Sequence, residues 1–144
     1  MKPNTRAPWH LWVVGIAALL WNAVGALDYV MTQTRNPQYM QGFTAEQLAF
    51  FYSLPAWTVA SWAVGVWGAV VGSLLLLFRK ALAVWFFLAS LAGVALTTLQ
   101  NYVLSNGREV MGGPGALVFT AVIFLVAIGM YVYARAMRQR GAIA

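Results

Sequence analysis

Long apolar runs separated by short polar segments dominate this sequence. Four runs reach the roughly 20 residues that a helix needs to cross the hydrocarbon core of a bilayer, and they cover approximately residues 9–30, 56–78, 81–102 and 115–134. Membrane-spanning strands would be shorter and would alternate apolar with polar residues, so helices are the expected form. The pattern predicts an all-α polytopic membrane protein, a four-transmembrane-helix bundle in one transmembrane domain over residues 1–144.

The segment at about residues 45–54 is apolar but does not belong to a span. Thr44 and Gln47 have the spacing of a capping box, which predicts that a helix begins there. A straight helix from residue 45 to residue 78 would be about 50 Å long at 1.5 Å per residue, longer than the bilayer core. Pro55 is the natural break. We therefore expect 45–54 to form a separate helix at the membrane interface.

Composition supports a membrane protein and restricts its chemistry. Hydrophobic residues make up 62% of the 144 residues and charged residues 8%, against roughly 25% charged residues in soluble domains. Cysteine is absent and His10 is the single histidine, so the ligands that metal sites use are scarce. We expect no cofactor, no metal and no enzymatic activity. We also expect no nucleic-acid partner, because the placement of the positive charges fits a membrane surface better.

The basic residues predict the orientation. Seven of the nine lysines and arginines lie near the two termini or between the second and third spans, and only Arg35 and Arg108 lie in the other loops. Because basic residues concentrate on the cytoplasmic side, both termini are expected in the cytoplasm and the protein in the bacterial inner membrane. The basic start before an apolar run also has the pattern of a signal peptide, with a passable cleavage site after Ala26. We expect the run to remain as the first span, since it continues the regular alternation.

An internal similarity links the first and third spans. A shift of 73 positions places residues 28–35 on residues 101–108, with tyrosine, valine and arginine identical. Chance agreement is easy in apolar sequence, so duplication and coincidence both stay open. If the repeat is real, two helical hairpins are related by an axis along the membrane normal, and the pairs at 28–29 and 101–102 lie at the same depth.

Polar and aromatic residues near the outer ends of the spans form the candidate binding site. Asp28 lies at the C-terminal end of a helix, where the macrodipole disfavours a negative charge, and near lipid, where an unpaired carboxylate is costly. Its partner is expected to be Arg35 or Arg108 in an ion pair that clamps an outer loop, or else a polar ligand. The candidate ligand-binding residues are Asp28, Asn22, Tyr29, Trp21, Trp62, Asn101, Tyr102, Arg35 and Arg108.

Two interpretations of these side chains remain open. A pocket with aromatic walls and converging amides suits a small polar solute such as a sugar. Alternatively, the tryptophans anchor the protein at the interface and the amides join helices.

Small residues recur every four positions on the second and third spans. The second span carries Ser61, Gly65, Ala69 and Ser73, and the third carries Ala89, Gly93 and Thr97. Such stripes let helices approach closely, either within the bundle or between protomers. A homo-oligomer or a larger membrane complex would both use them.

Four segments of the chain resemble one protein family. They are "LLWNAVGALDYVMTQ", "FYSLPAW", "LSNG" and "GGPGAL", and they resemble small four-helix inner-membrane proteins of proteobacteria, mostly uncharacterised and sometimes described as sugar transporters. The resemblance covers nearly the whole chain and implies the four-helix topology and sugar transport. It supplies no binding residues.

The sequence therefore predicts an integral membrane protein that binds or transports a small polar, sugar-like solute through an outward-facing cavity. The alternative is a non-enzymatic accessory or assembly subunit whose glycine stripes pack against a larger membrane complex.

Overall fold

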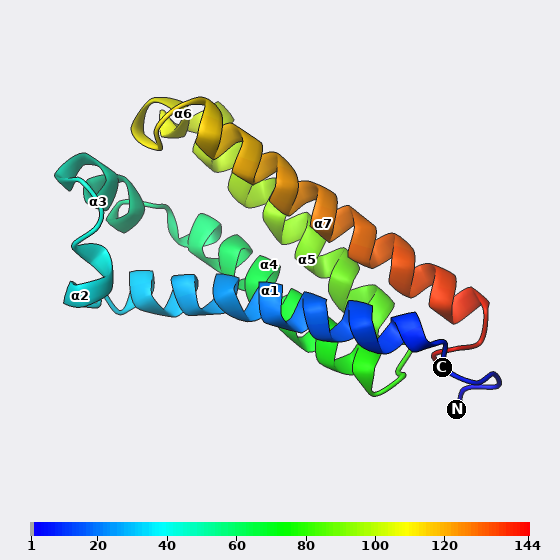
Figure 1. Ribbon diagram of the computed structural model, residues 1–144. Coiled ribbons are helices and arrows are strands. Elements are labelled where there is room, and N and C mark those ends of the chain that lie inside the picture. Colours follow the sequence, from blue (N-terminus) through cyan, green and yellow to red (C-terminus); the bar gives the residue numbers. More distant parts are fainter. Residues whose placement is uncertain (1) are drawn as a thin grey trace.

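The computed structural model describes residues 2–144, and this part of the chain contains helices and no strands (Figure 1). The long helices are α1 (Trp9–Gln33), α4 (Ala56–Leu77), α5 (Ala83–Leu99) and α7 (Pro114–Gln139). A π-helical turn, η1 (Gln100–Leu104), continues α5, and the loops contain α2 (Pro37–Met40), α3 (Ala45–Tyr52) and α6 (Gly107–Val110). Four helices, with η1 counted as part of the third, are long and apolar enough to cross a membrane. The predicted all-α four-helix bundle is confirmed.

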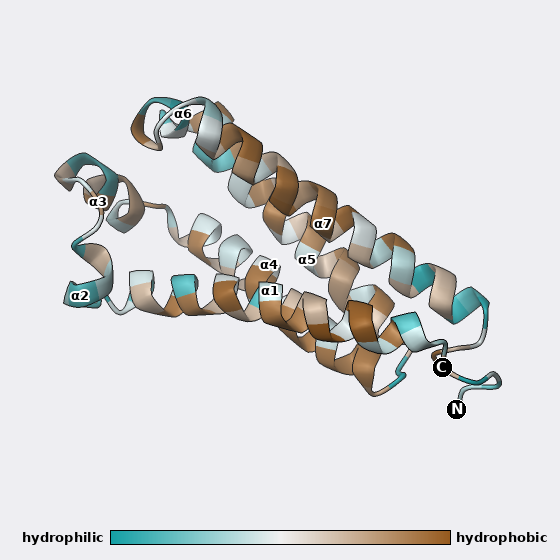
Figure 2. Ribbon diagram, in the orientation of Figure 1, coloured by the Kyte–Doolittle hydropathy of each residue, from teal (hydrophilic) through white to brown (hydrophobic). Residues whose placement is uncertain are grey.

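The long helices pack in chain order. α4 packs against both α1 and α5, α5 packs against α7, and α1 makes little backbone contact with α7. Both chain termini lie at one end of the bundle, which we call the terminal end, and α2, α3 and α6 lie at the other, the loop end (Figure 1). The pair α1 and α4 separates from the pair α5 and α7 toward the loop end. Figure 2 shows apolar residues along the long helices and hydrophilic residues gathered at both ends.

The expected helix breaks are present. Thr44 and Gln47 form both hydrogen bonds of a capping box at the start of α3, and Pro55 is the N-cap of α4. The third span ends differently from the expected one, because the α-helix changes to the π turn of η1 at Gln100. α7 continues past the apolar span to Gln139, since residues such as Arg135 still favour a helix where it leaves the lipid.

The terminal end is tightly packed. Its core includes Leu11 of α1, Leu76 of α4 and Phe87 of α5, which are at most 2% exposed, together with the C-terminal Ile143. The Arg79 side chain holds the C-terminal segment by donating from Nε to the Ala142 carbonyl at 2.8 Å. These contacts leave the bundle closed at this end.

The small-residue stripes mediate the contact between α4 and α5. A Cβ on Gly93 would lie 2.5 Å from the carbonyl oxygen of Ser61 and 2.7 Å from the backbone nitrogen of Gly65. The Ser90 hydroxyl donates to the Gly65 carbonyl at 2.6 Å across the same contact. Of the two uses that the sequence left open, the structure shows packing within one chain.

Candidate functional site

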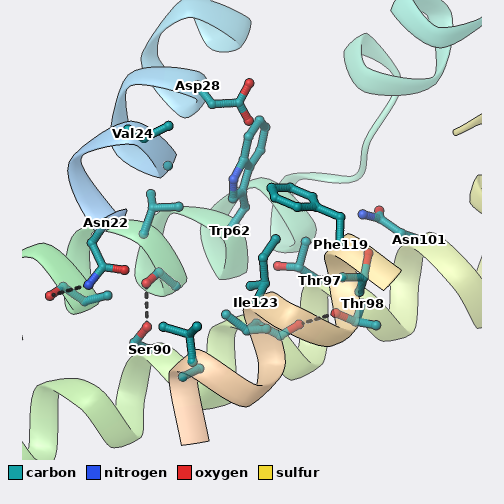
Figure 3. A pocket seen from close by; sticks show the side chains of 18 of the residues that line it. Asn22, Val24, Asp28, Trp62, Ser90, Thr97, Thr98, Asn101, Phe119 and Ile123 are labelled. Atoms are coloured by element: carbon teal, nitrogen blue, oxygen red, sulfur yellow. Dashed lines mark hydrogen bonds between the residues drawn. The ribbon is translucent and has the colours of Figure 1, made fainter. Parts of the chain in front are cut away.

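The loop-end half of the bundle contains a cavity of about 590 Å³. This volume falls within the roughly 300–1,000 Å³ of sites that hold small molecules. All four long helices contribute walls, and residues of α2 and α3 line the cavity near the loop end (Figure 3). Small side chains leave the space open on several walls, among them Gly65 and Ala69 of α4 and Ala127 of α7.

Most of the predicted site residues line this cavity. They are Trp21, Asn22, Asp28, Trp62, Asn101 and Tyr102. Tyr29 does not line it and packs edge-on against the Trp62 ring, with 4.9 Å between the ring centroids. Arg35 and Arg108 also lie outside the lining.

Asp28 has a different partner from the one expected. Its carboxylate accepts a hydrogen bond from the hydroxyl of Tyr39 in α2. Arg35 instead places its guanidinium carbon 4.2 Å from the ring centroid of Tyr52. The predicted ion pair with Arg35 fails because α1 ends at Gln33 and Arg35 takes a left-handed conformation (φ 52°), so the two residues no longer share a helix face.

The prediction that Arg108 is the partner of Asp28 is also wrong. Arg108 belongs to α6 in the other loop, where its side chain is exposed. Within residues 2–144 the carboxylate is therefore held by a phenol rather than by a cation.

The Tyr39 phenol is well suited to remain a hydrogen-bond donor. Burial, together with the hydrogen bond to the Asp28 carboxylate and its charge, raises the pKa of Tyr39 to about 12. The phenol is thus protonated at neutral pH and ties α2 to α1. This contact places α2 over the loop end of the cavity.

The Asn22 side chain links α1 to α4. Its side-chain nitrogen donates to the Ser73 hydroxyl at 3.1 Å and toward the Ala69 carbonyl at 3.5 Å, both in α4. The alternative interpretation of the amides, that they join helices, therefore describes Asn22. Its donor nitrogen is occupied by α4 contacts rather than by the cavity.

Asn101 differs from Asn22, although both are cavity-lining amides. Its side-chain oxygen is buried and has no hydrogen-bond partner among the described residues. The π turn of η1 carries Asn101, and α6 is pressed against this turn, since a Cβ on Gly107 would lie 2.2 Å from the Asn101 carbonyl. π turns are frequent at functional sites. Asn101 is thus a lining amide whose side-chain oxygen has no partner within residues 2–144.

The deeper part of the cavity is apolar. Thr97 and Thr98 project from α5, but their hydroxyls donate to the backbone carbonyls of Gly93 and Val94 at 2.8 Å (Figure 3). The remaining lining there is mainly apolar, namely Val66, Ala69, Phe87, Val94, Ile123, Val126, Ala127 and Met130, and its other polar members are Asn22 and Ser90. The cavity is therefore graded, with the Asp28 carboxylate and the Asn101 amide toward the loop end and a mainly apolar floor.

The lining residues that the sequence did not predict include two informative groups. Phe119, Ile123 and Met130 belong to α7, where lining residues recur at helical spacing, so the signal was a periodic face. Tyr39 and Phe43 come from the loop between α1 and α4. Nothing local in the sequence marks these two, because their position depends on how the loop folds back over the bundle.

The geometry of the predicted repeat can be compared directly. Asp28 and its counterpart Asn101 both line the cavity. Tyr29 contacts Trp62 of α4, and the hydroxyl of its counterpart Tyr102 lies 3.0 Å from the Thr120 hydroxyl of α7. Each tyrosine thus contacts the second long helix of its own hairpin, as a repeated hairpin predicts. The duplication itself stays a prediction.

Residues 2–144 contain no group of three or more histidine, aspartate or glutamate side chains able to hold a metal ion. Comparison of the chain with protein families, with curated proteins and with solved structures gives no match. The interpretation of the site therefore depends on its own geometry.

Proposed function

We propose that this multi-pass membrane protein binds a small amphipathic molecule in the cavity between α1, α4, α5 and α7. The observation that carries the proposal is the grading of the cavity, with the Asp28 carboxylate and the Asn101 amide toward the loop end and a mainly apolar floor beyond them. Such a cavity suits a ligand that has one polar group and an apolar body.

The polar group of the ligand is a donor, and an ammonium fits best. Asp28 in its ionised form only accepts hydrogen bonds. Trp62 adds an aromatic surface near the carboxylate (Figure 3), and aromatic rings attract cations. A cationic group would also offset the cost of a carboxylate close to lipid.

The sugar-like solute of the sequence analysis is a weaker fit. A sugar carries a hydroxyl on most carbons, and each buried hydroxyl without a partner costs free energy. The floor of the cavity provides few donors for the hydroxyl oxygens of a sugar, because the Ser90, Thr97 and Thr98 hydroxyls already donate to backbone carbonyls. We therefore favour an organic cation with an apolar body over a sugar.

The proposed orientation places the cavity on the outer side of the bacterial inner membrane. Basic residues favour cytoplasmic termini, and the cavity lies in the half of the bundle remote from the termini. The packed core at the terminal end separates the cavity from that side. The cavity thus lies in the outer half of the membrane, and any transport would need the terminal end to open.

The test uses the purified full chain with tetraphenylphosphonium, an apolar organic cation, and with glucose. Asp28→Asn should weaken tetraphenylphosphonium binding by roughly tenfold or more, because the cation loses its counter-charge in a poorly hydrated cavity. Glu109→Gln is the matched control, since it removes an exposed carboxylate in α6 outside the cavity lining. Equilibrium dialysis measures both. Equal binding by wild type and Asp28→Asn, or binding of glucose alone, would contradict the proposal.

Native mass spectrometry of the protein, extracted gently from its host membrane, tests the natural ligand. We expect a small bound mass that disappears in Asp28→Asn. A stoichiometric protein partner that persists in the variant, with no small mass bound, would favour the accessory role. That alternative relied on the small-residue stripes, of which Gly65 and Gly93 are occupied by the contact between α4 and α5, whereas Ala89 is exposed.

A further inference from the structure

The seam between α1 and α7 differs from the other helix contacts. These helices line the same cavity but make little backbone contact with each other. Near the terminal end His10 Nδ1 lies 2.6 Å from the Tyr133 hydroxyl. Farther along, the Trp21 and Phe119 rings approach with 6.2 Å between their centroids. Side chains, rather than packed helix backbones, therefore bridge this seam.

The seam is where the cavity reaches the lipid-facing surface. Val24 of α1 is 69% exposed and Phe119 of α7 is 59% exposed, yet both line the cavity. Each also belongs to a helix that is long and apolar enough to span the membrane. In a membrane, hydrocarbon therefore lies beside the seam between α1 and α7.

The path toward the loop end is covered. Phe43, Phe51 and Met111 line the cavity from the loops. The Gln47 side chain of α3 donates to the Val110 carbonyl of α6 at 3.2 Å, which joins the two loops, and the Tyr39 hydrogen bond to Asp28 holds α2 to α1. The loop end is thus roofed, whereas the seam between α1 and α7 is not packed.

The cavity also extends far enough along the helices to hold a lipid chain. Asp28 lies five residues before the end of α1 at Gln33, about 8 Å below the loop end at 1.5 Å per residue. Met130, at the floor, lies 16 residues into α7 from Pro114, or about 24 Å. The hydrocarbon core is about 30 Å thick. A polar group at Asp28 is therefore near the head-group level, and a chain that reaches Met130 runs along the bilayer normal.

We infer that the cavity is loaded from the bilayer, and that its ligand is a single-chain amphiphile with an ammonium head that passes between α1 and α7. The ammonium meets the Asp28 carboxylate, and the aliphatic chain occupies the apolar floor. This inference rests on the proposed function and adds to it the source of the ligand and its chemical class.

The experiment places the full chain in nanodiscs of phosphatidylcholine and phosphatidylglycerol that contain a trace of a long-chain primary amine with a photoreactive diazirine near the chain end. After irradiation, peptide mass spectrometry locates the label. We expect label on cavity-floor residues such as Ile123 and Met130. The amine should label the floor several-fold more than its uncharged N-acetyl derivative does, and Asp28→Asn should remove that difference.

Two substitutions on α7 form a matched pair. Ala127→Phe fills the cavity and should reduce floor labelling several-fold, whereas Ala121→Phe places the same ring at an exposed position outside the lining and should leave it unchanged. If Ala127→Phe does not fold, Ile123→Trp is the second filling variant. Folding is checked by gel filtration and circular dichroism.

The outcomes separate this inference from the proposed function. Label confined to outward residues such as Leu125 and Val132, or floor label that the filling variants do not reduce, overturns loading from the bilayer. If tetraphenylphosphonium binding still depends on Asp28, the proposed function stands without loading from the bilayer. If tetraphenylphosphonium does not bind either, the inference and the proposed function both fail.

Discussion

At the scale of single residues, chemically similar side chains have different roles in this protein. Asn22 and Asn101 both line the cavity, but α4 occupies the donor nitrogen of Asn22, while the side-chain oxygen of Asn101 is buried without a partner. Asp28 is held by Tyr39, whereas the two arginines that could have neutralised it lie elsewhere. Residue type alone predicted a polar site, and the contacts show which of its polar atoms already have partners.

The link between Tyr39 and Asp28 predicts a specific dependence on pH. The pKa of Tyr39 in the folded protein is about 12, against 10.0 in its ordinary state. Because the folded value is the higher one, the stabilising contribution of Tyr39 is complete below about pH 10 and is lost as the pH rises through 12. The difference in phenolate absorbance between wild type and Tyr39→Phe should therefore have its midpoint near pH 12.

Asp28→Asn provides the control for this titration. It removes the charge that helps to raise the pKa of Tyr39, so the midpoint should fall toward the ordinary value. A wild-type midpoint near 10 would show that the hydrogen bond to Asp28 is not formed.

At the scale of elements, α4 and α5 form the most extensive contact between helices of the bundle. Gly93 lies against the backbone around Ser61 and Gly65. In lipid, helices associate through such close packing and through interhelical hydrogen bonds, and Ser90 supplies one of these at the same place. This contact joins the hairpin of α1 and α4 to the hairpin of α5 and α7.

Gly93→Ala should destabilise the protein. Its Cβ would lie 2.5 Å from the Ser61 carbonyl oxygen, so the two helices must move apart. Overpacking of this kind typically costs about 1–3 kcal/mol. The free energy of unfolding, measured by circular dichroism in mixed micelles with increasing denaturing detergent, should fall by that amount.

Gly129→Ala is the matched control in α7. A Cβ there meets nothing within 4 Å, and alanine favours a helix over glycine by up to about 1 kcal/mol. The variant should be as stable as wild type or more stable. Equal destabilisation by both substitutions would show that α4 and α5 are not in close contact at Gly93.

At the scale of the whole molecule, the two ends have opposite character. The terminal end is closed by the core that includes Leu11, Phe87 and the C-terminal Ile143. The loop end contains the cavity under short helices, and α1 and α7 make little backbone contact beside it. A ligand in this cavity therefore reaches the bilayer more directly than it reaches the side of the termini.

Membrane orientation can be tested with single cysteines, because the chain contains none. Gly42→Cys lies in the loop before α3, where an added side chain meets nothing within 4 Å, and Arg138→Cys lies in the exposed last turn of α7. A membrane-impermeant maleimide should label Gly42→Cys in spheroplasts and Arg138→Cys only after permeabilisation. The reverse pattern would invert the proposed orientation and place the cavity on the cytoplasmic side.

Several structural features could be predicted from local sequence. The four spans follow from apolar length, and the start of α3 follows from the Thr44 and Gln47 capping box, because both are local signals. Six of the nine candidate site residues line the cavity, because polar and amphipathic groups in an apolar helix face the bundle interior. The pairing of Asp28 with Arg35 failed at the end of α1, where one change of backbone conformation removed the expected helix face.

The sequence by itself determined the class of the protein and the number of its spans, because about 20 apolar residues in lipid have one satisfactory backbone conformation, the helix. Only the tertiary structure decided that Tyr39 is the partner of Asp28, that the glycine stripes serve contacts within the chain, and that α1 and α7 leave a seam beside a cavity. Helices that are apolar nearly all round give little indication of which face meets a neighbour. The fold of the loop over the bundle is likewise decided by contacts between residues distant in sequence.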